Sequence, residues 1–169
     1  MAVLPIVSYP DPRLAQAAAE VSDFDAGLER LAGDLLDTMR AAPGVGITAP
    51  HVGIARRVVV LELSAQDGVR VFVNPRLEWQ SADRARHTEG SVSMPGATAE
   101  VERPASCRVS WRDLGGDPHE ATFDGFLSVC LQHEIDQLDG VFWIDRLSRL
   151  KREMLVKRWT KERKRGGKG

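Results

Sequence analysis

The chain has 169 residues, 43% of them hydrophobic and 28% charged, with 23 Lys and Arg against 24 Asp and Glu. This length suits one compact domain whose core needs no disulfide or metal, and the composition excludes global disorder. No apolar stretch approaches the ~18 residues of a transmembrane helix, and residues 1–9 lack the basic start of a signal peptide. The sequence therefore predicts a single domain over 1–169 in the cytoplasm, with Cys107 and Cys130 as reduced thiols in the core.

The formal net charge of −1 conceals an uneven distribution. Residues 146–169 carry eleven Lys and Arg but only two Glu, a net charge of +9, so that residues 1–145 carry −10. The acidic body argues against specific DNA binding, whereas the basic segment is suited to a polyanion. We expect an amphipathic helix from about Ser148 and a frayed end from Lys164, with an apolar seam formed by Leu147, Leu150, Met154, Leu155 and Trp159.

The hydrophobic pattern predicts helices and strands that do not alternate along the chain. A helix is expected over 23–39 with Ser22 as its cap, and a second from about Gly125 to Gly140. Strands are expected over 57–63, 69–73, 101–111 and 121–123. Asn74 and Pro75 are expected to end the second of them, with 76–80 continuing the sheet. This order predicts an α+β domain whose antiparallel sheets are wrapped around a central helix.

Three segments carry the candidate chemistry: GVGITAPH at 44–51, EGSVS at 89–93 and HEIDQLDG at 133–140. The third nearly matches H-E-x-x-H, in which two His on one helical face hold a metal and the Glu moves a proton of the metal-bound water. Here the last position is Gln137, and an isolated H-E pair on a buried helix is more often structural than catalytic. The remaining histidines His87 and His119 lie near loop signals and are expected to be solvated.

Taken together, the three segments resemble the motifs of the peptide deformylase family, which run G-x-G-x-A-A-x-Q, E-G-C-L-S and H-E-x-D-H-x-x-G. The resemblance covers roughly residues 7–158 and implies the family's α+β fold, built around the helix that carries the third motif. It also implies the family's activity, which is removal of the formyl group from the N-terminal formyl-methionine of nascent chains. In the family, a basic C-terminal helix can contact the ribosome, and residues 146–169 would be its counterpart.

The resemblance also assigns roles by position. The family binds one divalent metal, usually ferrous iron, through the Cys of the second motif and both His of the third. His133 is a matched ligand and Glu134 the matched general acid/base, whereas Ser91 and Gln137 occupy the other two ligand positions. His51 replaces the oxyanion-stabilising Gln, and the backbone N–H of Val92 is the second oxyanion donor. Substrate contacts are expected from Gly44, Val45, Gly46, Ile47, Glu89, Gly90 and Ile135.

The two replaced ligands predict a weakened site. A serine hydroxyl is not ionised at neutral pH as a thiolate is, and the Gln137 side chain offers only a neutral amide oxygen. We therefore expect iron or zinc to bind weakly or not at all. The chain would then be an impaired or inactive relative that still binds N-formylmethionyl or methionyl peptides.

Two other interpretations keep an activity. His51 and His133 could hold the metal with Glu89, Ser91 or Gln137, and Glu134 would remain the general acid/base of an active deformylase or amidohydrolase. Alternatively, Ser91 could act as a nucleophile with His51 or His133 as its base. If the site has only drifted, His51 and Gln137 are expected to hydrogen-bond to each other.

Overall fold

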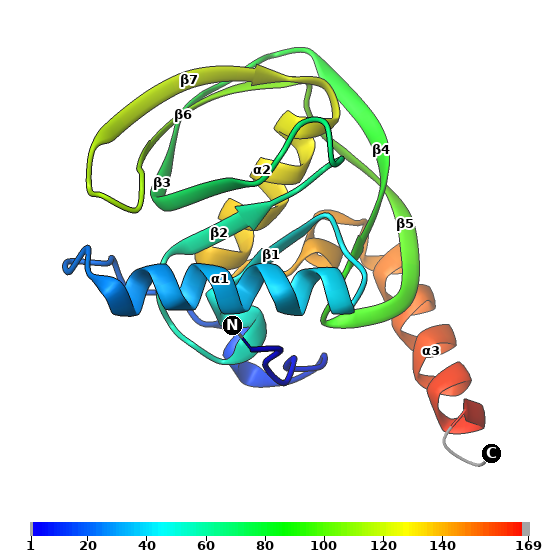
Figure 1. Ribbon diagram of the computed structural model, residues 1–169. Helices are drawn as coiled ribbons and strands as arrows, with labels where there is room; N and C mark the ends of the chain where they lie inside the picture. Colours follow the sequence, from blue (N-terminus) through cyan, green and yellow to red (C-terminus); the bar gives the residue numbers. More distant parts are fainter. Residues whose placement is uncertain (1, 167–169) are drawn as a thin grey trace.

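In the computed structural model, which describes residues 2–166, three α-helices and seven strands make up the chain (Figure 1). The helices are α1 (Ala26–Ala41), α2 (Gly125–Leu138) and α3 (Arg149–Gly166), with short 3-10 helices η1 (Pro12–Ala15), η2 (Ala49–Val52) and η3 (Trp143–Arg146). The strands are β1 (Gly46–Thr48), β2 (Val58–Leu61), β3 (Arg70–Gln80), β4 (Arg84–Ser91), β5 (Met94–Pro104), β6 (Ser106–Arg112) and β7 (Pro118–Asp124). The α+β class predicted from the sequence is confirmed.

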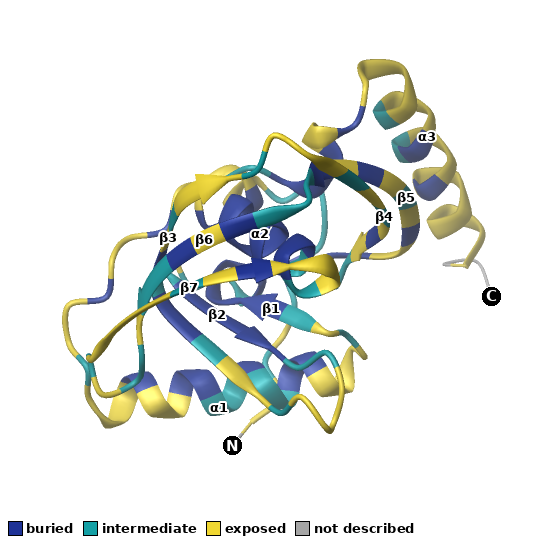
Figure 2. Cartoon of the chain, turned by 90° about the horizontal axis from the view of Figure 1, so that it is seen from above, coloured by how far each residue is buried: buried dark blue, intermediate teal, exposed yellow. Residues whose placement is uncertain are grey.

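The central helix α2 is enclosed by two antiparallel sheets. Five strands form one sheet in the order β1-β2-β3-β6-β7, and β4 pairs with β5 in a separate hairpin. Ten of the fourteen residues of α2 are buried, in agreement with its place inside the curve of the strands (Figure 2). A helix buried on all sides positions its polar residues inside the molecule, and the third motif lies on this helix.

Strand β2 joins the two halves of the core. All four of its residues are buried, because its two faces pack against different helices. Val59 and Leu61 lie in the cluster that includes Ile135 of α2. Val58 and Val60 lie in the cluster of α1. Side chains alternate across a strand, so an unbroken apolar run is the pattern of a strand covered on both faces.

Two predicted boundaries were wrong. Helix α1 begins at Ala26, because Asp25 and not Ser22 caps it by accepting a hydrogen bond from the backbone N–H of Leu28 at 3.0 Å. Pro75 does not end a strand: β3 runs through it, and the pairing with β6 shifts register between Val73 and Arg76. This irregularity accommodates a residue that has no N–H to donate.

The β4–β5 hairpin was missed from the sequence. A single strand was predicted within 101–111, whereas β5 ends at Pro104 and β6 begins at Ser106. The hairpin has mostly polar and charged residues, with Arg86 opposite Glu102 across the strands, so it lacks the apolar alternation of a half-buried strand. It carries the second motif and forms one wall of the site.

Helix α3 projects from the body, and its basic residues are largely exposed (Figure 2). Three residues of the predicted apolar seam, Leu147, Leu155 and Trp159, are buried, but Leu150 and Met154 are 67% and 63% exposed. Trp159 anchors the helix by donating from Nε1 to the backbone oxygen of Pro95 at 2.9 Å. The helix continues to Gly166, past the fraying predicted from Lys164, and 167–169 lie outside the described residues. None of the helices between residues 2 and 166 is long and apolar enough to cross a membrane.

Candidate functional site

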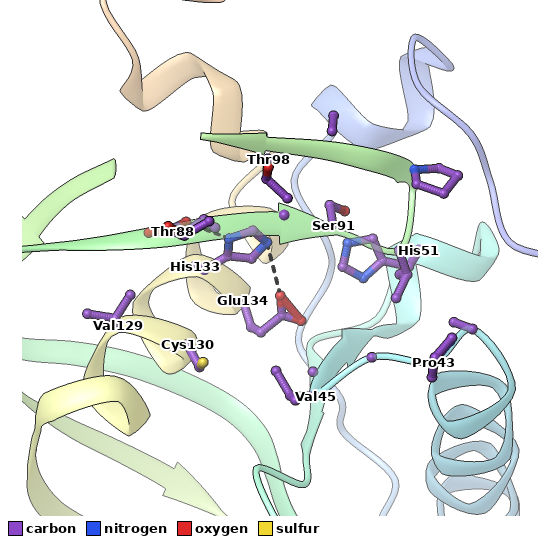
Figure 3. Close-up of a pocket in the computed structure, with 18 of the residues that line it drawn as sticks. Pro43, Val45, His51, Thr88, Ser91, Thr98, Val129, Cys130, His133 and Glu134 are labelled. Carbon is purple, nitrogen blue, oxygen red and sulfur yellow. Dashed lines mark hydrogen bonds and ion pairs between the residues drawn. The ribbon is translucent and has the colours of Figure 1, made fainter. Parts of the chain in front are cut away.

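A cavity of about 410 Å³ lies between the start of α2, the β4–β5 hairpin and the segment that leads into β1 (Figure 3). All three motif segments contribute to its lining. His51, Ser91, His133 and Glu134 form its polar part, and Val92, Phe126 and Val129 are among its apolar residues. The fold therefore brings His51 and Glu134, which are 83 positions apart in the chain, into one cavity.

His133 is oriented by a buried carboxylate. Its Nδ1 lies 2.8 Å from Oε1 of Glu89, and Arg103 donates two hydrogen bonds to the same carboxylate, at 2.6 and 2.9 Å. These partners lower the pKa of Glu89 against the opposing effect of burial. An ionised Glu89 accepts, so Nδ1 carries a proton and Nε2 is the ring nitrogen that faces the cavity.

Arg103 also holds the hairpin to the rest of the molecule. Its Nη1 donates to Asp136 of α2 at 2.8 Å, and Asp136 accepts two further hydrogen bonds from Arg146, at 2.9 and 2.8 Å. The Arg103 side chain is 4% exposed. Two arginines and two carboxylates thus form a charge-balanced network, in which Arg103, Glu89 and Asp136 are buried and Arg146 is about half exposed.

Glu134 is the buried acid of the cavity. Its Oε1 lies 3.3 Å from Nε2 of His133, and its Oε2 has no hydrogen-bond partner among the described residues. Burial raises the pKa of Glu134 to about 7, with His133 acting in the opposite direction. A carboxyl with a pKa near neutrality is suited to proton transfer. The wall beside it is tight, since a Cβ on Gly46 would lie 3.4 Å from this carboxyl and 2.8 Å from Leu61.

We predict that Glu134 makes the protein less stable as the pH rises. Its folded-state pKa lies above the ordinary value of 4.5, so the folded state binds more protons between about pH 4.5 and 7, and the free energy of unfolding falls across that window. Glu134→Gln should abolish a decline of up to about 3 kcal/mol between pH 5 and 7.5, measured by urea unfolding. Glu100→Gln, a change at an exposed carboxylate of β5, is the control and should keep the decline. An unaltered decline in the Glu134 variant would contradict the prediction.

His51 is held as a neutral ring. Its Nδ1 accepts a hydrogen bond from the backbone N–H of Thr48 at 2.9 Å and lies 3.0 Å from the Thr48 hydroxyl. Burial, and secondarily the charge of His133, lowers the pKa of His51 to about 3. Its Nε2 is buried without a partner among the described residues.

Gln137 does not reach the cavity. Its Nε2 donates to the backbone oxygen of Leu14 at 2.8 Å, and Gln137 is not among the residues that line the cavity. The expected hydrogen bond between His51 and Gln137 is therefore wrong, because each side chain has a different partner. Ser91 lines the cavity, and its Oγ accepts a hydrogen bond from the backbone N–H of Ser93 at 3.1 Å.

The donor set does not fit the metal that the family implies. Of the three ligand positions, His133 presents a ring nitrogen, Ser91 a neutral hydroxyl, and Gln137 points elsewhere. The Thr48 N–H points at Nδ1 of His51, and a neutral ring that accepts this bond carries its proton on Nε2. Within residues 2–166, no group of three or more His, Cys, Asp or Glu is arranged to hold an ion.

Only some of the residues expected to contact substrate line the cavity. Gly44, Val45, Gly46, Glu89 and Gly90 line the cavity. Ile47 and Ile135 do not, because they are 0% and 2% exposed and pack in the two hydrophobic clusters on either side of β2. The sequence prediction for these two residues was wrong: they follow cavity residues in the chain, but their side chains point into the core.

Other residues of the cavity escaped sequence reasoning. Cys130 was expected in the core but lines the cavity, where burial raises the pKa of its thiol to about 12. Residues 95–98 of the hairpin and Phe126 also contribute. His87 was expected to be solvated, yet its Nδ1 is buried. His119 is exposed, as predicted, and pairs with Asp113 at 2.8 Å.

This fold, with the H-E pair on a buried central helix beneath a hairpin and a glycine-containing segment, defines a protein of the peptide deformylase class. A family profile described as polypeptide deformylase matches residues 3–153. A peptide deformylase-like protein of Brucella melitensis is 59% identical over 161 residues, which cover 95% of this chain and 98% of that protein.

Solved structures agree with the sequence comparison. A peptide deformylase from Legionella pneumophila has a TM-score of 0.92 and 36% identity, covering 99% of both chains. A peptide deformylase from Synechococcus elongatus, solved in complex with actinonin, has a TM-score of 0.88 and 36% identity over 92% of this chain and 86% of that one. The chain belongs to the polypeptide deformylase family and has the peptide deformylase fold.

Proposed function

We propose that this chain is a peptide deformylase-like protein that binds N-formylmethionyl or methionyl peptides in its cavity and has lost metal-dependent deformylation. The observation that carries the proposal is that Gln137, at the third ligand position, donates to the backbone oxygen of Leu14 and is not among the residues that line the cavity. Ser91 at the second position adds a hydroxyl in place of a thiolate, so the site supplies one strong ligand where catalytic zinc takes three.

The remaining parts of the cavity support retained binding. The related enzyme of Synechococcus elongatus was solved with actinonin, which shows that this fold holds a ligand. In this chain, Gly44, Gly46 and Gly90 line the cavity, and a Cβ on any of them would lie within 3.1 Å of another protein atom, so the glycines let the walls pack closely. The hairpin wall is fixed by the Arg103 network. A preorganised cavity needs little reordering on binding.

The alternative of an active deformylase rebuilt around His51 and His133 has less support. It requires the lone pair of His51 Nε2 to face the metal. The hydrogen bond from Thr48 leaves a proton there instead. Glu134 keeps a pKa suited to proton transfer, but its chemistry in the family depends on a metal-bound water.

Metal content and hydrolysis, measured on the same preparation, test the proposal. We expect well under one iron or zinc per chain in protein purified without oxygen or chelators. We also expect no hydrolysis of formyl-Met-Ala-Ser that depends on Glu134, and saturable binding of that peptide by calorimetry. About one metal per chain, together with hydrolysis abolished by Glu134→Ala, would establish the rebuilt active site instead.

The basic helix α3 supports a second partner, ribosomal RNA. Between Arg149 and Gly166 it carries nine Lys and Arg against two Glu, and Lys157, Arg158 and Lys161 are exposed. We expect its binding to ribosomes to weaken steeply with salt. Changing these three residues to Ser should weaken binding and lower the slope of log affinity against log salt by about 3.

A matched control replaces three arginines of the body, Arg84, Arg86 and Arg108, which lie on β4 and β6. This variant has the same change in net charge, and its salt slope should stay that of the parent chain. Equal losses in both variants would show that net charge and not the helix determines binding.

A further inference from the structure

A second cavity lies at the C-terminal end of α2 and has no lining residue in common with the first. Its volume is about 700 Å³, which is within the size range of sites that bind small molecules. The segment before α1, the residue before β2, strands β3 and β6, the start of β7 and the end of α2 all contribute to its lining. The two cavities are therefore separate candidate sites.

The irregular pairing of β3 with β6 lies in the wall of the second cavity. Asn74 and Pro75 of β3 together oppose the single residue Trp111 of β6, and all three line the cavity. Asn74 has a φ of 51° and is fixed by two hydrogen bonds with the backbone of Val21, at 2.8 and 2.9 Å. A β-bulge of this kind re-aims side chains and is frequent beside functional sites. Specific contacts thus determine the shape of this wall.

The charges of the second cavity are not balanced. Three arginines and two carboxylates line it, which leaves one formal positive charge. Arg57 is matched, because its Nη1 lies 2.9 Å from Oδ1 of Asp139. Two carboxylates that lie outside the lining also have partners: Asp113 lies 2.8 Å from Nε2 of His119, and Glu78 accepts a hydrogen bond from a serine hydroxyl at 2.6 Å.

The other two arginines of the lining, Arg76 and Arg112, can offer their guanidinium groups to an anion. Arg76 lies 3.9 Å from Glu20, and no carboxylate within residues 2–166 pairs with Arg112. One N–H of Arg112 donates to the backbone oxygen of Gly116 at 2.7 Å, which orients the side chain. Arg76 is opposite Ser110, two residues before Arg112, so both arginines belong to one face of the sheet. Residues 1–145 carry a net charge of −10, so this positive cavity has the opposite sign to the body around it.

The same cavity has a flat aromatic wall. The rings of Trp111 and His119 stack with their centroids 5.4 Å apart and their planes at 15°. Trp111 is held from within by Phe72, at 4.9 Å, whereas the His119 side chain is 44% exposed. Leu77 and Ile135 add apolar surface to the lining. A planar ring of a ligand could therefore stack on His119 and extend the aromatic pair.

We propose that the second cavity binds a small organic anion in which a planar ring carries a phosphate or carboxylate group. Arg76 and Arg112 hold the anionic group, and the ring stacks on His119. Guanidinium groups match phosphate and carboxylate oxygens alike, so nucleoside monophosphates and aromatic carboxylates share the chemistry that this cavity recognises. The site is separate from the cavity assigned to peptides, so this inference does not depend on the proposed function.

Four probes test the proposal by calorimetry on the full chain. AMP and indole-3-acetate have both a ring and an anionic group, adenosine lacks the charge, and inorganic phosphate lacks the ring. We expect AMP, indole-3-acetate or both to bind at one site per chain, at least about tenfold more tightly than adenosine or phosphate. Binding of one alone would identify the anionic group that the site prefers. Absence of binding by both, or equal affinity for adenosine or phosphate, would overturn the proposal.

Two arginine variants place the anion. Arg76→Met and Arg112→Met should each weaken binding of the charged ring about tenfold, the usual effect of losing a charge-assisted hydrogen bond. Arg76 is 72% exposed and has no close carboxylate partner, so its variant should fold like the parent chain. Arg84→Met, a change at an exposed arginine outside both cavities, is the matched control and should bind normally. Unchanged binding in both arginine variants would overturn the assignment.

His119→Ala tests the ring separately from the charge. It should weaken binding of AMP or indole-3-acetate at least about fivefold, because a stacking partner is lost. Its weak affinity for inorganic phosphate should stay that of the parent chain. An unchanged affinity for the charged ring would show that the ring does not stack on His119.

Two further controls exclude the other places that an anion or a ring could occupy. The basic helix α3 attracts anions in general, so the variant with Lys157, Arg158 and Lys161 changed to Ser should bind the charged ring as tightly as the parent chain. Saturating formyl-Met-Ala-Ser should not displace the ring, because the peptide is assigned to the first cavity. Loss of binding in the helix variant, or displacement by the peptide, would overturn the proposal.

Discussion

Arg103→Met is expected to lower the free energy of unfolding by about 3–5 kcal/mol at pH 7, the usual effect of breaking a buried ion pair. Arg103 donates to both Glu89 and Asp136, and its side chain is 4% exposed. Methionine fills a similar volume, so the loss comes from two carboxylates that are left in a buried site with fewer partners. Urea unfolding followed by tryptophan fluorescence measures the change.

Arg84→Met is the matched control on the same hairpin. Arg84 lies 3.6 Å from Glu102, and both side chains are about half exposed, so this variant should change stability by less than about 1 kcal/mol. If Arg103→Met lowered the free energy of unfolding no more than Arg84→Met does, the network would not hold the hairpin to α2. If Arg103→Met lost peptide binding while its free energy of unfolding stayed unchanged, Arg103 would shape the cavity wall without stabilising the fold.

The pH dependence of the same variant gives an independent check. The pKa of Glu89 is lowered in the folded state, so its contribution is present above the unfolded-state pKa and is lost as the pH falls through the folded-state value. The difference between the parent chain and Arg103→Met should therefore be largest near neutral pH and shrink below about pH 4. A difference in the free energy of unfolding that grew as the pH fell would contradict this prediction.

The fold was accessible from sequence where apolar periodicity is strong. Helix α2 and the fully apolar β2 were found at nearly their true bounds. The β4–β5 hairpin was not, because charged residues such as Arg86, Glu102 and the buried Arg103 interrupt its apolar positions and hide the alternation of a strand. Pro75 was misjudged for a related reason: local rules end a strand at proline, whereas the pairing with β6 absorbs it in an irregular register.

The sequence located part of the cavity lining but not the orientation of the side chains. The motifs located His51, Ser91, His133 and Glu134, all of which line the cavity. Sequence spacing did not show that Gln137 faces Leu14, since helical position gives a face but not the partner that captures a side chain. Nor did it show that a backbone N–H three residues away fixes the proton of His51. Both facts depend on tertiary geometry, and both determine what chemistry the cavity can do.

Restoring the two replaced ligands should restore a metal site. Ser91→Cys supplies a thiolate and Gln137→His an imidazole, which together with His133 make the three protein ligands of a catalytic zinc site. We expect the double variant to bind about one zinc per chain, with an affinity at least about 100-fold above that of the parent chain. Metal analysis and competition with a chelating dye measure both quantities. Each single variant should gain far less, because two ligands hold zinc poorly.

The hydrogen bond that the residue 137 side chain donates to the backbone oxygen of Leu14 is the main obstacle to zinc binding by the double variant. The imidazole introduced by Gln137→His must leave the Leu14 oxygen and turn toward His133 and the new thiol at position 91. A buried carbonyl without a donor is destabilising by about 1–3 kcal/mol. Zinc should offset that loss, so the double variant should unfold at higher urea with zinc than without it. A second double variant, Ser110→Cys with Gln137→His, places the thiol outside the cavity and should bind no stoichiometric zinc. If the first double variant folds but binds no more zinc than this control, the backbone around residues 91 and 137 has itself moved away from ligand geometry. Weak zinc binding would then result from the backbone geometry as well as from the two replaced side chains.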